Sequence, residues 1–316
     1  MECREYTKQK NDLYKHFLCF VDEEIQIDYH FEEFIAIIQK HKYEENPEEF
    51  KMILYLTSEL SKNHRRSHSF LDKIEKIISH YSEYLKINFT KLELFKIFKK
   101  NPQILHYLFI TNIISIDDDI IKLLFKEPNQ TFVIRKYKEE KMPDFESKRR
   151  NYETKRSITQ NYIYYFYIDI QPILGEEEKE MIEKELFELD NDIFNEFERK
   201  CREGENDSYI SKLIRNDSVK EFIIHVNRNN LSLNSEINLS IFETNPFLIQ
   251  KKSTLIEYAA FFGSIQIFNY LRFNKIELTP SLWLYAIHGN NPDIIHILEE
   301  NHVKPSDKSF KKCLKA

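Results

Sequence analysis

Glycine is scarce in this chain, with four residues among 316. No two of them are close enough to form G-x-G-x-x-G or a P-loop, so the sequence excludes the glycine-rich motifs that cradle phosphates. Few glycines also leave few positions for tight hairpin turns, which favours helices. The four are Gly175, Gly204, Gly263 and Gly289.

Cysteines and long apolar runs are also few. The four cysteines stand far apart, no C-x-x-C pair exists, and no apolar secretory segment begins the chain. We therefore expect reduced thiols in an intracellular protein, in the cytoplasm or alternatively the nucleus. The longest uncharged run, Asn101–Ile116, is shorter than the roughly 20 apolar residues of a spanning helix, so no membrane span is predicted.

Positive and negative side chains are nearly equal in number, with 46 Lys and Arg against 52 Asp and Glu. Charged residues make up 31% of the chain, yet the net charge is only −6. This composition gives no overall electrostatic case for a nucleic-acid binder. Hydrophobic residues make up 41% and aromatic residues 14%, enough for a sizeable core.

Residues 1–140 carry the apolar spacing of successive amphipathic helices, for example from Phe70 to Leu85. The pairs Asn46-Pro47 and Asn101-Pro102 each combine a helix cap with a proline suited to the first turn. The polar stretch 141–160 is interpreted as a linker. After it, Tyr162–Leu174 favours a short helix, and Glu176–Glu203 is predicted to be one long charged helix ended by Gly204.

The C-terminal third repeats at an offset of 27 residues. Ala259 aligns with Ala286, and Gly263 aligns with Asn290, the two residue types that most readily end a helix with positive φ. An upstream copy around Asp217 is separated from these by an insertion, which we place at residues 229–250. Small residues at 259 and 260 are expected where one helix closely meets the next unit.

A second pair of segments extends the repetition. Leu94–Leu108 and Leu284–Leu298 are identical at seven of fifteen positions, including an Asn-Pro pair and the histidines His106 and His296. The same cap and apolar stripe in two places indicate one helix–turn–helix unit used repeatedly. One unit cannot bury its apolar face alone, so stacked units would share a continuous core.

The segment Thr254–Gly263, TLIEYAAFFG, resembles the opening of the ankyrin repeat, T-P-L-H-x-A-A-x-x-G. The chain is similar to a large ankyrin-repeat family expanded in parasitic protists, closely over about 204–316 and loosely upstream. Leu255 and Glu257 depart from the Pro and His of that motif, and Lys275 replaces an expected glycine. The short period of 27 implies trimmed hairpin fingers.

The expected fold is all-α, a helical-repeat solenoid with C-terminal ankyrin-like repeats. Three regions are predicted: a helical region with ankyrin-like pairs at 1–140, a linker and long charged helix at 141–204, and a repeat array at 205–316 that ends inside a repeat.

Four residues are candidates for binding a partner: Phe261, Phe262, Trp283 and His288. The resemblance implies that side chains before the turn glycine face the concave surface, where an exposed aromatic would act as an anchor. Burial between repeats is the alternative for the three aromatic residues, and helix capping is the alternative for His288.

Other candidates have simpler structural interpretations. His64 and His68 have the spacing of metal ligands, but no third ligand is evident, so we predict no metal site. His106 and His296 are expected to share a partly buried, hydrogen-bonded structural role. The acids Glu176–Glu178 suit a helix N-terminus better than a catalytic pair.

The basic segment Lys148–Arg156 carries the alternative function. It could serve as a nuclear import signal or a phosphate-binding patch, with the nearby tyrosines of Tyr162–Tyr167 stacking on bases. A solvated linker, and aromatic side chains packed on the following helix, explain the same residues more simply. The predicted function is a non-catalytic scaffold, without cofactor, that binds an unidentified protein partner.

Overall fold

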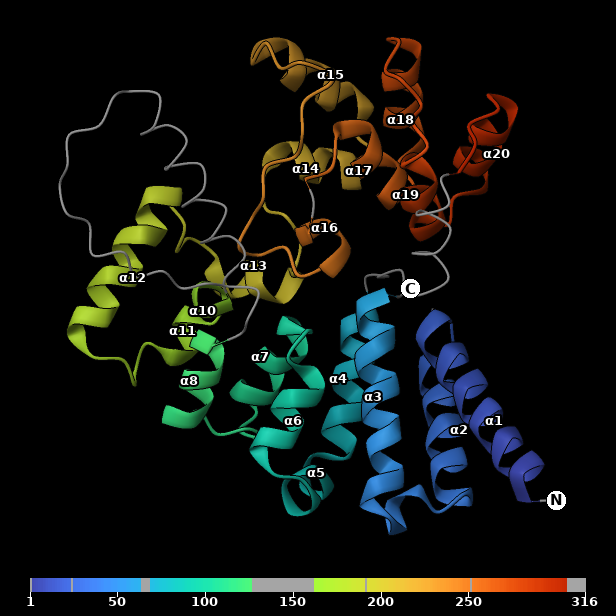
Figure 1. The fold of residues 1–316 in the computed structure, drawn as a ribbon, viewed down its shortest axis with the longest axis vertical. Coiled ribbons are helices and arrows are strands. Elements are labelled where there is room, and N and C mark those ends of the chain that lie inside the picture. Colours follow the sequence, from blue (N-terminus) through green and yellow to red (C-terminus); the bar gives the residue numbers. More distant parts are fainter. Residues whose placement is uncertain are drawn as a thin grey trace. The chain divides into compact units, whose positions relative to one another are not determined.

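The computed structural model describes residues 2–23, 25–63, 69–126, 162–190, 192–250 and 252–305. Within these ranges the regular structure is helical and no strand forms, beyond one isolated pairing of Glu236 with Thr254. The all-α class predicted from the sequence is confirmed. Two compact units follow one another, Met1–Ile116 (unit 1) and Asp117–Ala316 (unit 2) (Figure 1).

Three of the described helices of unit 1 begin at signals that the sequence contains. In α3, the backbone N–H of Glu48 donates to Asn46 Oδ1 at 3.1 Å, and Pro47 is the first helical residue. Thr90 and Glu93 cap the start of α6 reciprocally. The elements are α1 (Glu2–Asp22), α2 (Ile27–Lys40), η1 (Tyr43–Glu45), α3 (Pro47–Asn63), α4 (Phe70–His80), α5 (Ser82–Asn88), α6 (Lys91–Phe98) and α7 (Pro102–Ile110).

The helices of unit 1 pack against helices that are distant in the sequence. Helix α3 contacts α6 and helix α4 contacts α7, while α1 lies against both α2 and α4. The Phe17 and Phe34 rings stack with centroids 4.9 Å apart between α1 and α2. Asn101, at the start of α7, is buried and donates its amide to Ser58 Oγ of α3 at 2.7 Å. That hydrogen bond ties one helix pair to the preceding one.

A buried lysine holds the end of α1. Lys73 of α4 is only 2% exposed, and its ammonium donates to the carbonyl oxygens of Val21 and Glu23, both at 2.8 Å. Val21 lies in the last turn of α1 and Glu23 directly follows the helix, at an end where acceptors are left unsatisfied and positive charge is favoured. The ammonium therefore joins α4 to α1 through hydrogen bonds that water cannot easily replace.

Lys73→Met is expected to destabilise unit 1 by about 2 kcal/mol, because buried carbonyl acceptors lose a charged donor. Urea unfolding followed by circular dichroism measures the change. Lys76→Met is the matched control: Lys76 lies on the same helix, over the Phe31 ring at 4.3 Å, with its side chain 37% exposed. A Lys76 variant as destabilised as the Lys73 variant would show that the buried hydrogen bonds are unimportant.

Unit 2 begins with short helices and continues into three helix pairs (Figure 1). The described elements are α8 (Asp118–Lys126), α10 (Tyr162–Tyr165), α11 (Tyr167–Ile170), α12 (Glu176–Leu189), α13 (Phe197–Glu203), α14 (Tyr209–Arg215), α15 (Val219–Arg228), α16 (Pro246–Gln250), α17 (Leu255–Phe262), α18 (Ile265–Phe273), α19 (Leu282–Gly289) and α20 (Pro292–Glu300).

The single charged helix expected over Glu176–Glu203 is wrong. The segment forms α12 and α13, separated after Leu189. Asp190 adopts an extended conformation, and its side chain accepts from the Asp192 backbone N–H at 2.9 Å. Aspartate competes with the helix by bonding nearby backbone, which explains the break. Gly204 ends α13 in the left-handed conformation, as predicted.

The aromatic run before α12 is buried. Tyr164 and Tyr167 donate their hydroxyls to Glu185 and Glu183 of α12, and the Tyr165 hydroxyl donates to Cys201 O at 2.5 Å. Residues 164–167 are all at most 3% exposed. These rings pack on the following helices, as the simpler interpretation expected, so their faces are closed to a nucleic-acid base.

Three helix pairs form the C-terminal part of unit 2. The first helices α14, α17 and α19 contact one another in that order, and so do the second helices α15, α18 and α20. Each first helix also contacts its own second helix. Figure 1 shows the two rows side by side. Buried side chains from all three pairs form one continuous hydrophobic core.

Candidate interaction surface

The three helix pairs turn in the same way. Each first helix is followed by a residue with positive φ: Asp217 at 49°, Gly263 at 68° and Asn290 at 45°. The predicted equivalence of Gly263 and Asn290 is confirmed, because each is the left-handed C-cap of its helix. Glycine and asparagine adopt this conformation at low cost. The shared turn brings the C-terminal ends of α14, α17 and α19 to equivalent places.

The first residue after each turn reaches the preceding pair. Ser264 Oγ donates to Ile214 O at 2.5 Å, and the Asn291 amide donates to Gly263 O at 2.9 Å. Ser264 and Asn291 lie 27 positions apart, so the offset places a donor to the preceding pair at both positions, although the acceptors differ: Ile214 lies three residues before its turn residue, and Gly263 is the turn residue itself. The pairs are therefore joined by buried polar contacts as well as by apolar packing.

Small residues allow α17 and α19 to approach closely. Ala259, Ala260 and Ala286 are completely buried. A side-chain carbon added to Gly289 would lie far inside van der Waals contact with the Ala260 carbonyl oxygen and 3.0 Å from that of Phe261. The expectation that Ala259 and Ala260 mark a close contact with the next unit is confirmed.

Three of the four candidate binding residues meet at this end of the helices. Phe261 and Phe262 end α17, and His288 lies near the end of α19. The Phe261 ring lies 5.1 Å from the Phe262 ring and 5.5 Å from the His288 ring, measured between centroids. All three side chains are half-buried.

A fourth ring completes this group, which we call the aromatic patch: Phe247, Phe261, Phe262 and His288. Phe247 of α16 stacks on Phe261 with centroids 5.8 Å apart and planes within 10°, and its ring lies 4.7 Å from His288. The sequence analysis missed Phe247 because it lies in the insertion. A signal was present: Asn245-Pro246 repeats the pair that begins α3, α7 and α20.

Trp283 lies apart from the aromatic patch. Its indole Nε1 donates to Val303 O, 2.5 Å away, and its ring is half-buried against the core of the helix pairs. The sequence had grouped it with Phe261, Phe262 and His288. Because Trp283 lies in the first turn of α19 and His288 in the last, the helix itself separates them.

Burial sets the charge of the aromatic patch. It lowers the pKa of the His288 imidazole below the ordinary value of 6.5, because the rings of Phe247 and Phe261 replace water around it. His288 is therefore neutral at pH 7, and the surface presents rings without a formal charge.

This pKa shift predicts a pH dependence of stability. Because the pKa of His288 is lower in the folded than in the unfolded protein, the unfolded state binds a proton at higher pH. The contribution of neutral His288 to stability is therefore complete above pH 6.5 and is lost as the pH falls toward the folded pKa. His288→Phe keeps a ring but removes this titration. Thermal melting from pH 7.5 to pH 5 should show a smaller loss for the variant, and equal losses would contradict the assignment.

A network of hydrogen bonds and one ion pair joins α14 to α17 through Arg215 and Tyr258. Arg215 Nη1 donates to Asn206 O at 2.7 Å and to the Tyr258 hydroxyl at 3.1 Å, and Arg215 Nε pairs with Glu205 at 2.6 Å. The backbone N–H groups of Asn206 and Asn245 donate to the carboxylate of Glu243. These contacts join the inserted segment at Glu243 to Asn206, and they join Asn206 through Arg215 of α14 to Tyr258 of α17.

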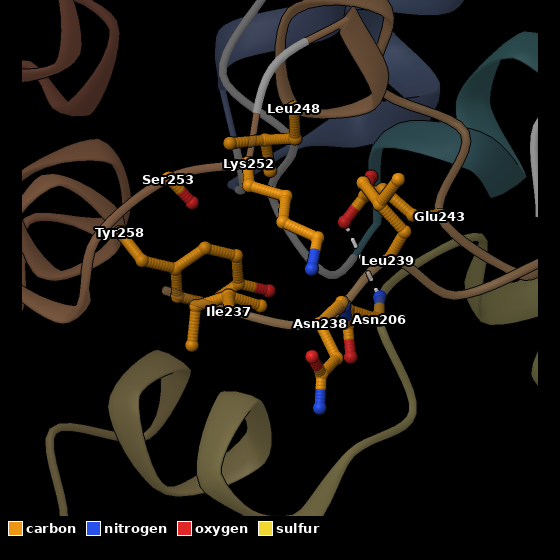
Figure 2. A pocket seen from close by; sticks show the side chains of 9 residues that line it. All are labelled: Asn206, Ile237, Asn238, Leu239, Glu243, Leu248, Lys252, Ser253 and Tyr258. Carbon is orange, nitrogen blue, oxygen red and sulfur yellow. Dashed lines mark hydrogen bonds between the residues drawn. The ribbon is translucent and has the colours of Figure 1, made fainter. Parts of the chain in front are cut away.

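The cavity beside this network is very small. Figure 2 shows Lys252, Glu243 and Tyr258 around it. Its volume open to the centre of a water molecule is about 10 Å³, room for about one water. This space cannot hold an organic substrate.

Several other candidates have defined outcomes. The prediction that His296 is partly buried is wrong, because its side chain is 68% exposed. Its Nε2 lies 3.1 Å from Glu300 Oε1, whereas His106 is half-buried. The acids Glu176–Glu178 do begin a helix, α12. His64, His68 and Lys148–Arg156 lie outside the described residues.

Searches for metal and membrane sites concern only the described residues. Among them, no group of three or more histidine, cysteine, aspartate or glutamate side chains is placed to hold a metal ion. None of the helices in these ranges combines the length and apolar character needed to cross a bilayer.

Comparison of the chain with protein-family models, with curated proteins and with solved structures finds no significant match.

Proposed function

We propose that this chain is a non-catalytic scaffold for protein–protein interaction, and that its C-terminal part is an ankyrin-type solenoid. The aromatic patch supports the binding role, because it places half-buried rings from α16, α17 and α19 on one surface. Aromatic side chains in this state act as binding anchors, since docking removes their remaining exposed area from water.

The ankyrin-type assignment rests on local geometry that recurs. The supporting features are the left-handed turn after each first helix, the hydrogen bonds that Ser264 and Asn291 each donate to the preceding pair, and the contact of Ala260 with Gly289. Neighbouring pairs contact each other along both rows, which is the arrangement a repeat array requires. A rigid row would hold the anchors of the aromatic patch at fixed spacing.

The proposal is tested by cross-linking the full chain in cell extract, identifying the partner, and titrating the purified partner against variants. Phe261→Ala is expected to weaken the affinity at least ten-fold, because it removes a central anchor. Phe273→Ala is the matched control, since Phe273 is 73% exposed at the end of α18. Equal affinities for wild type and both variants would refute the aromatic patch as the binding surface.

The nucleic-acid alternative loses part of its support, because Tyr164, Tyr165 and Tyr167 are buried. Its basic segment, Lys148–Arg156, stays a prediction. Titrating a labelled single-stranded oligonucleotide at rising salt would separate the two functions, since phosphate-driven affinity falls steeply with ionic strength.

A further inference from the structure

Within the aromatic patch, Phe247 of α16 covers the rings of Phe261 and His288. The Phe247 side chain of α16 lies against three rings from two helices: Phe261 of α17 at 5.8 Å, and Tyr285 and His288 of α19 at 4.9 and 4.7 Å between centroids. Phe261 and His288 are two of the anchors that the proposed function assigns to a partner. A partner ring cannot stack on Phe261 in the place that Phe247 fills.

Helix α16 depends on these contacts for its position. It has five residues, and isolated helices shorter than about 12 residues are unstable in water. Its backbone N–H groups at Leu248 and Ile249 both donate to Asn245 O, which makes little more than one turn. The side chains of Phe247 and Leu248 therefore hold it against α17 and α19.

The flanks of α16 are fixed independently of it. Thr244 donates its backbone N–H to Gly204 O at 3.0 Å, and Ile237 donates to Ser253 O at 2.7 Å. Thr244 and Ser253 are both at most 3% exposed. Moving Phe247 away from the rings would thus leave the hydrogen bonds of Thr244 and Ser253 in place, so only the short segment between these two residues needs to move.

We infer that the rings of Phe261, Tyr285 and His288 form a receptor for a short segment carrying an aromatic residue beside an aliphatic one, and that α16 is an internal ligand which a partner segment of this chemistry displaces. This inference rests on the proposed function and names its partner class. The internal ligand is tethered at both ends, so its effective concentration is high, and an external segment binds weakly until α16 is disabled.

The test uses a synthetic peptide of residues 243–252, ETNPFLIQKK, with 4-fluorophenylalanine at the position of Phe247. Fluorine NMR follows its binding to the full-length chain. Phe247→Ala is expected to bind the peptide at least ten-fold more tightly than wild type, because the internal competitor has lost its anchor. Adding Phe261→Ala is expected to abolish the gain, and an unlabelled peptide with alanine in place of the aromatic residue is expected not to displace the labelled peptide.

Equal binding, or no binding, to wild type and to a folded Phe247→Ala variant would overturn the inference and make α16 a fixed part of the core. Circular dichroism checks the fold. Hydrogen exchange on wild type keeps the test decisive if the variant unfolds: Leu248 and Ile249 amides should exchange at least ten-fold faster than those of Ala259 and Ala260, and equal protection would refute displacement.

The two proposals can fail separately. Peptide exchange could fail while Phe261→Ala still weakens the partner, which would leave the aromatic patch as an interaction surface that includes Phe247.

Discussion

Gly289→Ala is expected to destabilise unit 2 by about 3 kcal/mol, the largest effect we anticipate from adding one methyl group. The new carbon would meet the carbonyl oxygen of Ala260 and lie 3.0 Å from that of Phe261. Both obstacles are backbone atoms of α17, so no side-chain rotation relieves the overlap. Relief requires α17 and α19 to separate, which opens the core around Ala259 and Ala286.

Thermal and urea unfolding measure this effect. Gly175→Ala serves as the matched control, because a carbon added there meets nothing closer than Glu178 Oε2 at 3.7 Å. Gly175 precedes α12, where alanine caps a helix slightly worse than glycine, so its cost should stay below about 1 kcal/mol. Comparable losses in both variants would mean that α17 and α19 are not in close contact.

Arg215→Met is expected to cost about 3 kcal/mol, because it breaks a buried network whose other members keep their polar groups. The side chain of Arg215 is 11% exposed. Removing the guanidinium leaves the Glu205 carboxylate, the Tyr258 hydroxyl and the Asn206 carbonyl without this donor. Methionine fills similar volume, so the loss reports polar contacts more than packing.

Arg199→Met provides the comparison for this network. Arg199 forms ion pairs with Glu196 and Glu203, but its side chain is 44% exposed. Exposed pairs of this kind contribute less than about 1 kcal/mol, because water screens them and the side chains lose freedom. If the Arg199 and Arg215 variants unfold at the same urea concentration, the buried Arg215 network contributes no more to stability than the exposed pairs of Arg199.

Local signals predicted much of the fold correctly. The Asn-Pro pairs at 46–47 and 101–102 begin helices, Gly204 and Gly263 end helices, and Asn290 turns like a glycine. Each depends on a proline, hydrogen bonds or a φ angle within a few residues of the signal. The predicted cap at Asn101 is the exception, because its side chain makes no capping bond and donates to Ser58 of α3 instead. Such features need no knowledge of distant parts of the chain.

The two errors have different physical causes. The long helix over Glu176–Glu203 was read from composition and periodicity, but side-chain bonding at Asp190 outweighs a charged stripe with few buried residues. His296 was assigned by analogy with His106, yet its side chain points to solvent. Periodicity reports which face of a helix is apolar, while the neighbouring helix decides how much of each side chain is covered.

The sequence by itself determined the helical class, the turn residues and the offset that relates Ala259 to Ala286, because capping, positive φ and apolar spacing act over short distances. Only the tertiary structure decided that Phe247, from the insertion, stacks on Phe261 and His288 while Trp283 turns to Val303. Ring contacts between separate segments depend on the path of the loops that join them. That path follows from the buried bonds at Glu243, Arg215 and Ser253, which no local pattern encodes.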